Sequence, residues 1–126
     1  MLYPDTIENF TYMNFDFSKQ KDKKIQIHEK CKTNLIAVES VTYLECDGYV
    51  TTVYSIDNKP ITISKLLKHF EKELNQFGGF VRVNRKTLVN TRHISCIRKI
   101  GVKKIIEING CSIEISHRKS FLFKIT

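Results

Sequence analysis

Apolar and polar residues alternate along much of the chain, and a period of two is the pattern of a β-strand with one buried face. Residues 25–28 alternate strictly, and residues 34–38 and 41–45 form short apolar runs. Residues 49–54 are rich in β-branched and aromatic side chains, which favour strands. Further strand-like runs are residues 80–83, 88–89 and 94–97. The pattern therefore predicts many short strands in antiparallel sheets.

The clearest hairpin lies in the second half of the chain. Residues 105–115 surround Asn109-Gly110, which is the strongest short signal for a two-residue β-turn. With this turn, Ile108 faces Cys111 across the hairpin, and the apolar residues of both strands fall on one face. The expected buried face consists of Ile106, Ile108, Cys111, Ile113 and Ile115.

One segment changes to a period of 3.6, which is the pattern of an amphipathic helix. Its apolar face consists of Leu67, Phe70, Leu74 and Phe77. Ser64 precedes the segment and is a candidate N-cap, and Gly78-Gly79 follows it as a stop signal. A single helix in a strand-rich chain has to cover a sheet. Because its outer face carries both signs of charge, we expect it to support the fold and not to bind a ligand.

We therefore predict a mainly β fold with one short helix, built from small antiparallel sheets, with room for a further helical turn at the C-terminus. Residues 1–22 are expected to be an N-terminal extension or linker, and residues 23–126 the folded domain. The extension contains Phe10, Tyr12, Phe15 and Phe17, followed by a charged run from Lys19 to Lys24. The charged run is typical of a solvated linker. The aromatic residues leave two interpretations open, disorder or docking on the domain or on a second copy.

Positive charge is concentrated in one half of the chain. Residues 1–77 contain ten Lys or Arg and eleven Asp or Glu, a net charge of −1, and residues 78–126 contain eleven Lys or Arg and two acids, a net charge of +9. Such a concentration attracts a polyanion. Nucleic acid is the first candidate, because neutralising its phosphates releases counterions and drives binding. An anionic membrane surface is the second.

No pattern of catalytic residues is found in the sequence. The five glycines are scattered and form no phosphate-binding loop, and the four histidines have no metal-ligand spacing. We therefore expect a protein that is not an enzyme and has no cofactor, metal or small-molecule substrate. No apolar run approaches the roughly 20 residues that span a bilayer, and the N-terminus lacks a secretory signal. A cytoplasmic location without a membrane partner is expected.

The four cysteines are too far apart in sequence to form a CxxC pair. Cys46, Cys96 and Cys111 lie in apolar or strand-like runs, where a thiol behaves as a small apolar side chain. Buried free thiols are therefore favoured over disulfides, and a reducing compartment is expected.

Basic residues gather at the expected turns and strand ends. Residues 84–87 interrupt two apolar runs, residues 117–119 follow the hairpin, and residues 47–49 form another turn. Arginine and asparagine can bind guanine and adenine edges through paired hydrogen bonds, and lysine and threonine suit phosphates. Lys103 and Lys104, at the start of the hairpin, are expected to offer point charge to phosphates.

Four segments, in order, resemble the motifs of LytTR-type DNA-binding domains. Residues 41–50 (VTYLECDGYV) resemble the early strand and turn, and residues 63–74 resemble the helix that follows. Residues 80–90 (FVRVNRKTLVN) resemble the hallmark F-x-R-x-H-R-S-x-x-V-N, and residues 115–119 (ISHRK) resemble the closing V-S-R-R. The resemblance covers roughly residues 24–126. It implies small antiparallel sheets in a β-β-β arrangement, whose loops enter successive major grooves and bend the duplex.

The resemblance also implies site residues. Arg85 and Arg118 would read bases, Arg82 and Asn90 would be structural, and the remaining members would lie nearby or support phosphate contacts. The implied DNA-binding residues are Arg85, Arg118, Asn84, Lys86, Tyr49, Val50, His117 and Lys119. Asn84 stands where the family has His, Lys86 where it has Ser, and His117 where it has the first closing Arg. These changes keep hydrogen-bond donors, so binding is expected to survive with altered base preference.

The expected function is therefore sequence-specific binding of double-stranded DNA at promoter direct repeats in a bacterial cytoplasm, regulating transcription, with a homodimer on DNA as an option. Most such regulators are response regulators of two-component systems with an upstream receiver domain. Residues 1–22 are too short for one, so the chain is either a stand-alone regulator or an excerpt. The alternatives are a β-rich single-strand or RNA-binding module, which stacks bases on exposed aromatics, and a protein-interaction module. Phe80, Phe121 and Phe123 lie in apolar runs and are expected to be buried, which disfavours stacking.

Overall fold

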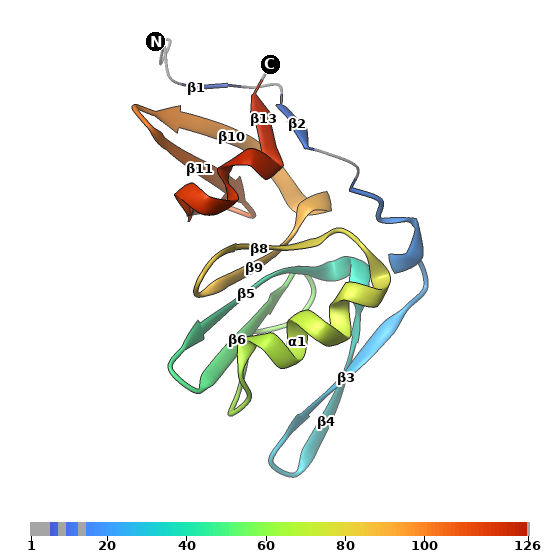
Figure 1. Cartoon of the computed structure of the whole chain (residues 1–126). Helices are drawn as coiled ribbons and strands as arrows, with labels where there is room; N and C mark the ends of the chain where they lie inside the picture. The colour runs from blue at the N-terminus through green and yellow to red at the C-terminus, as the bar shows by residue number, and fades with distance from the viewer. Residues whose placement is uncertain (1–5, 8–9, 13–14, 126) are drawn as a thin grey trace.

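The computed structural model describes residues 6–7, 10–12 and 15–125 (Figure 1). The strands are β1 (Thr6–Ile7), β2 (Phe10–Tyr12), β3 (Lys24–Glu29), β4 (Lys32–Ala37), β5 (Val41–Asp47), β6 (Val50–Ser55), β7 (Ile61–Ile63), β8 (Phe80–Asn84), β9 (Thr87–Asn90), β10 (Ile94–Ile100), β11 (Lys103–Ile108), β12 (Cys111–Ile115) and β13 (Phe123–Ile125). The helices are α1 (Leu67–Leu74) and the short 3₁₀ helices η1 (Ser18–Gln20), η2 (Val38–Ser40), η3 (Asn75–Phe77), η4 (Thr91–His93) and η5 (His117–Leu122).

The strands form small antiparallel sheets, as the sequence predicts. A five-stranded sheet has the order β7-β6-β5-β9-β8, and a four-stranded sheet has the order β1-β10-β11-β12. Two further pairs are β3 with β4 and β2 with β13. In Figure 1 the five-stranded sheet lies in the middle, with the β10–β11 hairpin above it and α1 and the β3–β4 hairpin below. The predicted mainly β fold with one short helix is confirmed.

The five-stranded sheet is buried on both faces, which explains its continuous apolar runs. Neighbouring residues on each central strand enter different cores. On β5, Leu44 packs in the core that contains α1 and the β3–β4 pair, and Tyr43 packs in the core that contains β11 and β12. On β9, Leu88 and Val89 divide in the same way. The runs therefore indicate a central layer and not a sheet with one wet face.

Helix α1 covers the five-stranded sheet with the predicted face, because Leu67, Phe70 and Leu74 are buried. The predicted N-cap is wrong. The helix begins after Leu66, whose backbone is extended and whose side chain makes no capping hydrogen bond. The reason is β7, which the sequence analysis did not identify. Its last residue, Ile63, still pairs with Thr51 of β6, so Ser64 lies in the connection and not at the helix.

The predicted β11–β12 register is confirmed. Ile108 pairs with Cys111 and Ile106 with Ile113, and the turn residues Asn109 and Gly110 both have positive φ, at 46° and 80°. The expectation that Cys111 is buried is wrong. Cys111 is the first residue of β12, the edge strand of its sheet, and is exposed, whereas Ile106, Ile108, Ile113 and Ile115 are buried.

The four thiols are free, as predicted, but none is buried. Cys31 and Cys111 are exposed, and Cys46 and Cys96 are partly exposed. Cys31 lies in the β3–β4 turn, outside both cores. Cys46 nevertheless packs against the core that contains α1, and Cys111 Sγ accepts a hydrogen bond from the Tyr43 hydroxyl at 3.4 Å.

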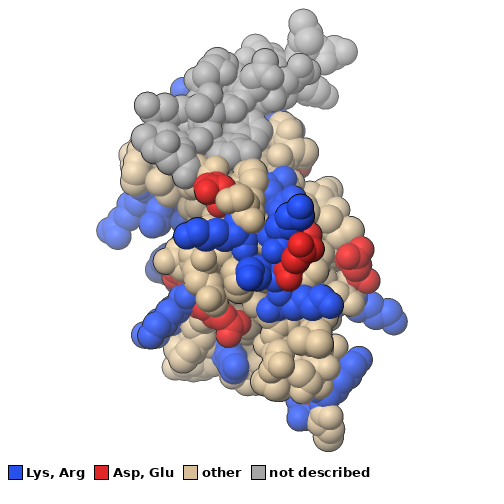
Figure 2. All heavy atoms as spheres, turned by 90° about the vertical axis from the view of Figure 1, so that its right-hand side faces the viewer, with Lys and Arg blue, Asp and Glu red and all other residues tan. Residues whose placement is uncertain are grey.

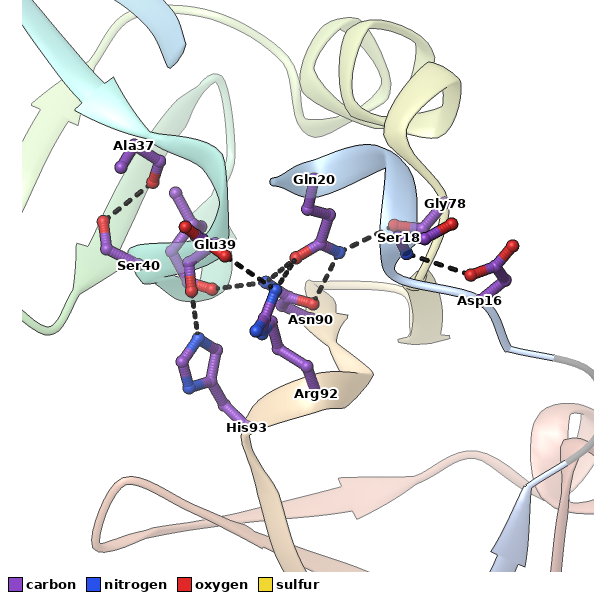
Figure 3. A network of polar contacts seen from close by, with 11 residues as sticks. Asp16, Ser18, Gln20, Ala37, Glu39, Ser40, Gly78, Asn90, Arg92 and His93 are labelled. Carbon is purple, nitrogen blue, oxygen red and sulfur yellow. Dashed lines mark hydrogen bonds and ion pairs between the residues drawn. The ribbon is translucent and has the colours of Figure 1, made fainter. Parts of the chain in front are cut away.

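Residues 15–20 dock on the domain. Phe15 packs against Phe123 with ring centroids 5.9 Å apart, and the Gln20 side chain is fully buried. Figure 3 shows the Gln20 amide between Gly78, Asn90 and Arg92, with η1 lying against the domain. Of the predicted N-terminal aromatics, the side chains of Phe10 and Tyr12 lie outside the described residues. The domain boundary expected near residue 23 stays a prediction. Residues upstream of it still pack against the domain.

The chain end forms η5 and then β13, which matches the expectation of a C-terminal helical turn. The prediction that the three phenylalanines of the basic half are buried is partly wrong. Phe80 and Phe123 are buried, but Phe121 is 67% exposed because it lies on the outer side of η5. Within the described residues, no helix combines the length and the apolar character that crossing a membrane requires.

Candidate nucleic-acid interface

The turn between β8 and β9 presents Arg85 and Lys86 to solvent. Asn84 pairs with Thr87 across the hairpin, so the two basic residues form a two-residue turn. The Asn84 side chain stabilises this turn, because its Oδ1 accepts a hydrogen bond from the Lys86 backbone N–H at 2.8 Å. This local bond is the usual reason for asparagine at the start of a turn.

A second basic element, η5, lies beside this turn. The Ser116 backbone N–H donates to the Val83 carbonyl at 2.8 Å, and Asn84 Nδ2 donates to the Glu114 carbonyl at 2.8 Å. These two bonds join the end of β12 to the end of β8. Arg118, two residues further along, is thereby held near Arg85 although the two are far apart in sequence.

The structure brings four of the predicted DNA-binding residues to one place. They are Asn84, Arg85, Arg118 and Lys119, and they line a shallow hollow of about 290 Å³ together with Glu71, Arg82 and Ser116. Arg85 and Arg118 are exposed, and Lys119 is partly exposed. The Asn84 amide also makes one hydrogen bond at each end within the protein, to the Glu114 carbonyl and from the Lys86 backbone N–H.

Arg82 supports the same turn from below. One guanidinium nitrogen forms an ion pair with Glu71 of α1 at 3.1 Å, and the other donates to the Arg85 carbonyl at 2.6 Å. The arginine therefore links the helix to the backbone of the exposed turn. In the sequence, the position of Arg82 within the motif, beside core residues, implied a structural role. It did not indicate which groups Arg82 would contact.

The β5–β6 turn lies next to the β8–β9 turn. The Cys46 backbone N–H donates to the Lys86 carbonyl at 2.8 Å, and Glu45 pairs with Thr87. Tyr49, in the β5–β6 turn, is 80% exposed, whereas Val50 is partly exposed at the start of β6. In Figure 1 the two turns and η5 lie along the left side of the molecule. The predicted residues on all three elements, His117 included, thus lie on one edge.

Lys104 does not have the exposed position expected for it. Its ammonium group donates to the Ser120 carbonyl at 3.0 Å and to the Phe123 carbonyl at 2.9 Å. Desolvation, and then the neighbouring charge of Lys99, lower the pKa of Lys104 below its ordinary value. The lysine therefore holds the C-terminal segment that carries Arg118. Sequence alone gave no sign of this, because the contact joins residues 16 and 19 positions apart through the side chain.

The opposite side of the molecule has a different charge pattern. Figure 2 shows the face that lies on the right of Figure 1, where basic side chains stand among acidic ones. One such pair is Arg92 and Glu39, at 3.2 Å. Arg92 also lies over the Phe17 ring, 5.8 Å from its centroid. Arg92 is thus engaged within the protein.

A larger hollow, of about 610 Å³, lies elsewhere, where the tip of the β3–β4 hairpin meets β7 and the residues before α1. It contains none of the predicted DNA-binding residues. A duplex is bound by protruding donors that reach into its grooves, so a hollow does not mark the interface. We therefore place the candidate site at the exposed hydrogen-bond donors of the edge formed by the β5–β6 turn, the β8–β9 turn and η5. In the part of the chain that the structure describes, no three His, Cys, Asp or Glu residues are grouped so that they could hold a metal ion.

Comparison with known proteins agrees with this geometry. The family model of the LytTr DNA-binding domain matches residues 31–125. A solved structure from Bacillus cereus, described as the LytTr DNA-binding domain of a methyl-accepting/DNA response regulator, has a similar fold with a TM-score of 0.63. The two chains share 22% sequence identity over 75% of this chain and 87% of that chain. Curated protein sequences contain no match. Since the family match spans most of the chain, the protein belongs to the LytTr DNA-binding domain family.

Proposed function

We propose that this chain binds specific double-stranded DNA at promoter repeats and thereby regulates transcription in a bacterial cytoplasm. The observation that carries the proposal is the pair Arg85 and Arg118, exposed on the β8–β9 turn and on η5, which hydrogen bonds between β8 and the end of β12 hold together. Membership of a DNA-binding family supports the nucleic-acid partner. The promoter repeats and the choice of bases rest on the resemblance described above.

In this proposal the two arginines read bases. A guanidinium can donate two parallel hydrogen bonds to the O6 and N7 of guanine, and its planar fork loses little entropy when the backbone around it is fixed. Arg82 and Asn84 fix that backbone from inside the protein. The edge thus presents preorganised donors to a major groove.

The other exposed groups of the edge supply affinity. Lys86, His117 and Lys119 flank the arginines and can neutralise phosphates, which orients the protein without reading sequence. Tyr49 and Val50 lie on the adjoining turn, where they can meet the sugar or base edges of the next groove. A homodimer on repeated sites and control by a two-component signal are part of the proposal. They rest only on what is usual for regulators of this family.

The experiment is a selection from a random duplex library, followed by titration of the enriched duplex and a scrambled copy. We expect a clear preference for the enriched duplex. With about 6–10 phosphate contacts, affinity should fall by roughly 10³–10⁵ between 50 and 200 mM salt. The absence of any enriched sequence, with folded protein, would overturn the proposal.

Binding of single-stranded nucleic acid is the second candidate, and the exposure of Phe121 and Tyr49 favours it. Exposed aromatic rings can stack with bases of any sequence. A single-stranded DNA and an RNA of the same sequence serve as competitors in the titration. Tighter binding to either competitor than to the duplex would favour this candidate and count against base reading by the arginines.

A further inference from the structure

The tip of the β10–β11 hairpin is an exposed apolar and basic projection. Gly101 and Val102 connect the two strands, and Gly101 has the positive φ of 61° that such a turn requires. Val102 is 87% exposed and Ile100 is 44% exposed. One exposed apolar residue needs no explanation, but here two exposed β-branched residues lie two positions apart at the end of the hairpin.

Like charges face each other at this tip. Lys99 pairs with Lys104 and Ile100 with Lys103, so three lysines lie on adjacent rungs of the ladder. Opposed like charges destabilise a β-hairpin, and the charge of Lys99 contributes to the lowered pKa of Lys104. A polyanion beside the tip would remove that repulsion.

The cations of the hairpin divide into engaged and available groups. Arg98 forms an ion pair with Glu107 at 2.6 Å, and Lys104 donates to the two backbone carbonyls described above. Lys99 and Lys103 are exposed, and neither has an ion pair with any residue that the structure describes. Two charged groups therefore flank the apolar tip, and within the described residues no ion pair engages them.

The β10–β11 hairpin is joined to the proposed DNA-binding edge, which consists of the β5–β6 turn, the β8–β9 turn and η5. The bonds from Lys104 to the carbonyls of Ser120 and Phe123 connect β11 to η5 and β13, and η5 carries Arg118. In Figure 1 the tip of the hairpin points to the same side as η5 and the β8–β9 turn, beyond η5. A duplex that lies over Arg85 and Arg118 and continues past η5 would pass this tip.

We propose that the β10–β11 tip is a DNA-contacting arm, distinct from the base-reading edge. The arm contacts the stretch of the same duplex that adjoins the base pairs read by Arg118. Lys99 and Lys103 contact phosphates on the two sides of the minor groove, and Val102 packs on the deoxyribose wall between them. β-Ribbons and exposed apolar side chains are known means of binding DNA grooves.

The arm rests on the proposed function but is tested separately from it. The probe is the duplex selected from the random library, trimmed until it just retains its preference over a scrambled copy. Unrelated sequence of about 10 base pairs, one helical turn, is then added at either end. We expect the addition at one end to strengthen binding by the full chain. That gain should shrink about tenfold between 50 and 200 mM salt, because two phosphate contacts give a slope near two.

Three variants carry the comparison. The double variant Lys99→Ala/Lys103→Ala should lose the gain from added sequence and keep its preference for the selected duplex. The single variant Val102→Ser should lose part of the gain with unchanged salt dependence. The control is Lys21→Ala/Lys23→Ala, which removes two exposed lysines between η1 and β3, on the opposite side in Figure 1, and should keep the full gain. Thermal unfolding checks that each variant is folded.

The outcomes separate the arm from the function. If the selected duplex has no advantage over its scrambled copy, the proposed function fails. If the preference is intact but added sequence strengthens binding at neither end, the arm alone fails. Equal losses in the two lysine pairs would mean unspecific charge and would also overturn the arm. So would an unchanged gain in the Lys99/Lys103 variant together with weaker self-association in sedimentation, which would make the tip a contact between copies.

Discussion

Gln20 and Asn90 form a reciprocal amide pair. Gln20 Nε2 donates to Asn90 Oδ1 at 2.9 Å, and Asn90 Nδ2 donates back to Gln20 Oε1 at 3.2 Å. Both side chains are fully buried, and Asn90 also donates to the Val41 carbonyl at 2.9 Å (Figure 3). The pair joins the segment before β3 to the end of β9, so the N-terminal segment is part of the packed structure.

Gln20→Ala should lower the free energy of unfolding by about 1–3 kcal/mol. The substitution leaves polar atoms of Asn90 and the Gly78 carbonyl without their partner in a buried place, which costs the desolvation of those groups. Denaturant unfolding measures the change. Lys19→Ala, on the exposed neighbouring residue, is the control and should have little effect. Equal stability of the two variants would mean that water replaces the lost bonds.

Arg85→Ala and Arg118→Ala should each weaken binding to the selected duplex by about 1–3 kcal/mol and binding to a scrambled duplex by much less. The reason is that each removes a paired donor to a base edge and changes the phosphate contacts little. Titration on both duplexes at several salt concentrations checks this. The same loss on both duplexes would show that the arginines contact phosphates and that the proposed readers are wrong.

Arg82→Lys should reduce discrimination between the two duplexes, by less than Arg85→Ala does. Lysine keeps the charge but cannot bind the Glu71 carboxylate and the Arg85 carbonyl with two arms at once. The β8–β9 turn should then hold Arg85 less firmly. Lys68→Ala, on the exposed face of α1, is the control. A normal ratio of the two affinities in a folded Arg82→Lys protein would exclude a positioning role.

Lys104→Met should lower the melting temperature, and Lys103→Met should leave it nearly unchanged. Methionine retains the length of the lysine side chain and removes the two hydrogen bonds to the carbonyls of Ser120 and Phe123. Because these carbonyls flank the exposed Phe121, amide hydrogen exchange of residues 117–125 should also become faster in Lys104→Met. Equal melting temperatures would indicate that the C-terminal segment is held by other contacts.

The sequence predicted those parts of the fold in which two signals agree. At residues 105–115 the turn pair and the alternation specify the same register, and the structure has that register. Ser64 shows the reverse case. Cap chemistry suggested a helix start, but pairing between Ile63 and Thr51 keeps the chain extended up to that point. A three-residue edge strand has too few side chains to give a periodic signal.

The sequence indicated four residues that the structure brings together at the candidate site, but not which residues bond within the protein. Motif likeness indicated Arg85, Arg118 and Asn84 together. The structure shows that Asn84 uses both ends of its amide inside the protein, toward Lys86 and Glu114. Lys104 was likewise indistinguishable from the exposed Lys103 next to it. Such assignments depend on contacts between distant segments, and side-chain chemistry alone does not reveal them.

The bonds that Asn84 makes to Lys86 of the β8–β9 turn and to Glu114 of β12 have a consequence for how binding sites can vary. They fix the separation between the β8–β9 turn and η5, and hence between the two arginines, as a property of the protein. In the proposed function, the domain therefore measures a fixed distance along the double helix. Replacing the exposed side chains would alter which bases are favoured without changing that distance. Inserting one base pair between the two contacted positions would give a DNA site whose spacing no longer matches the protein.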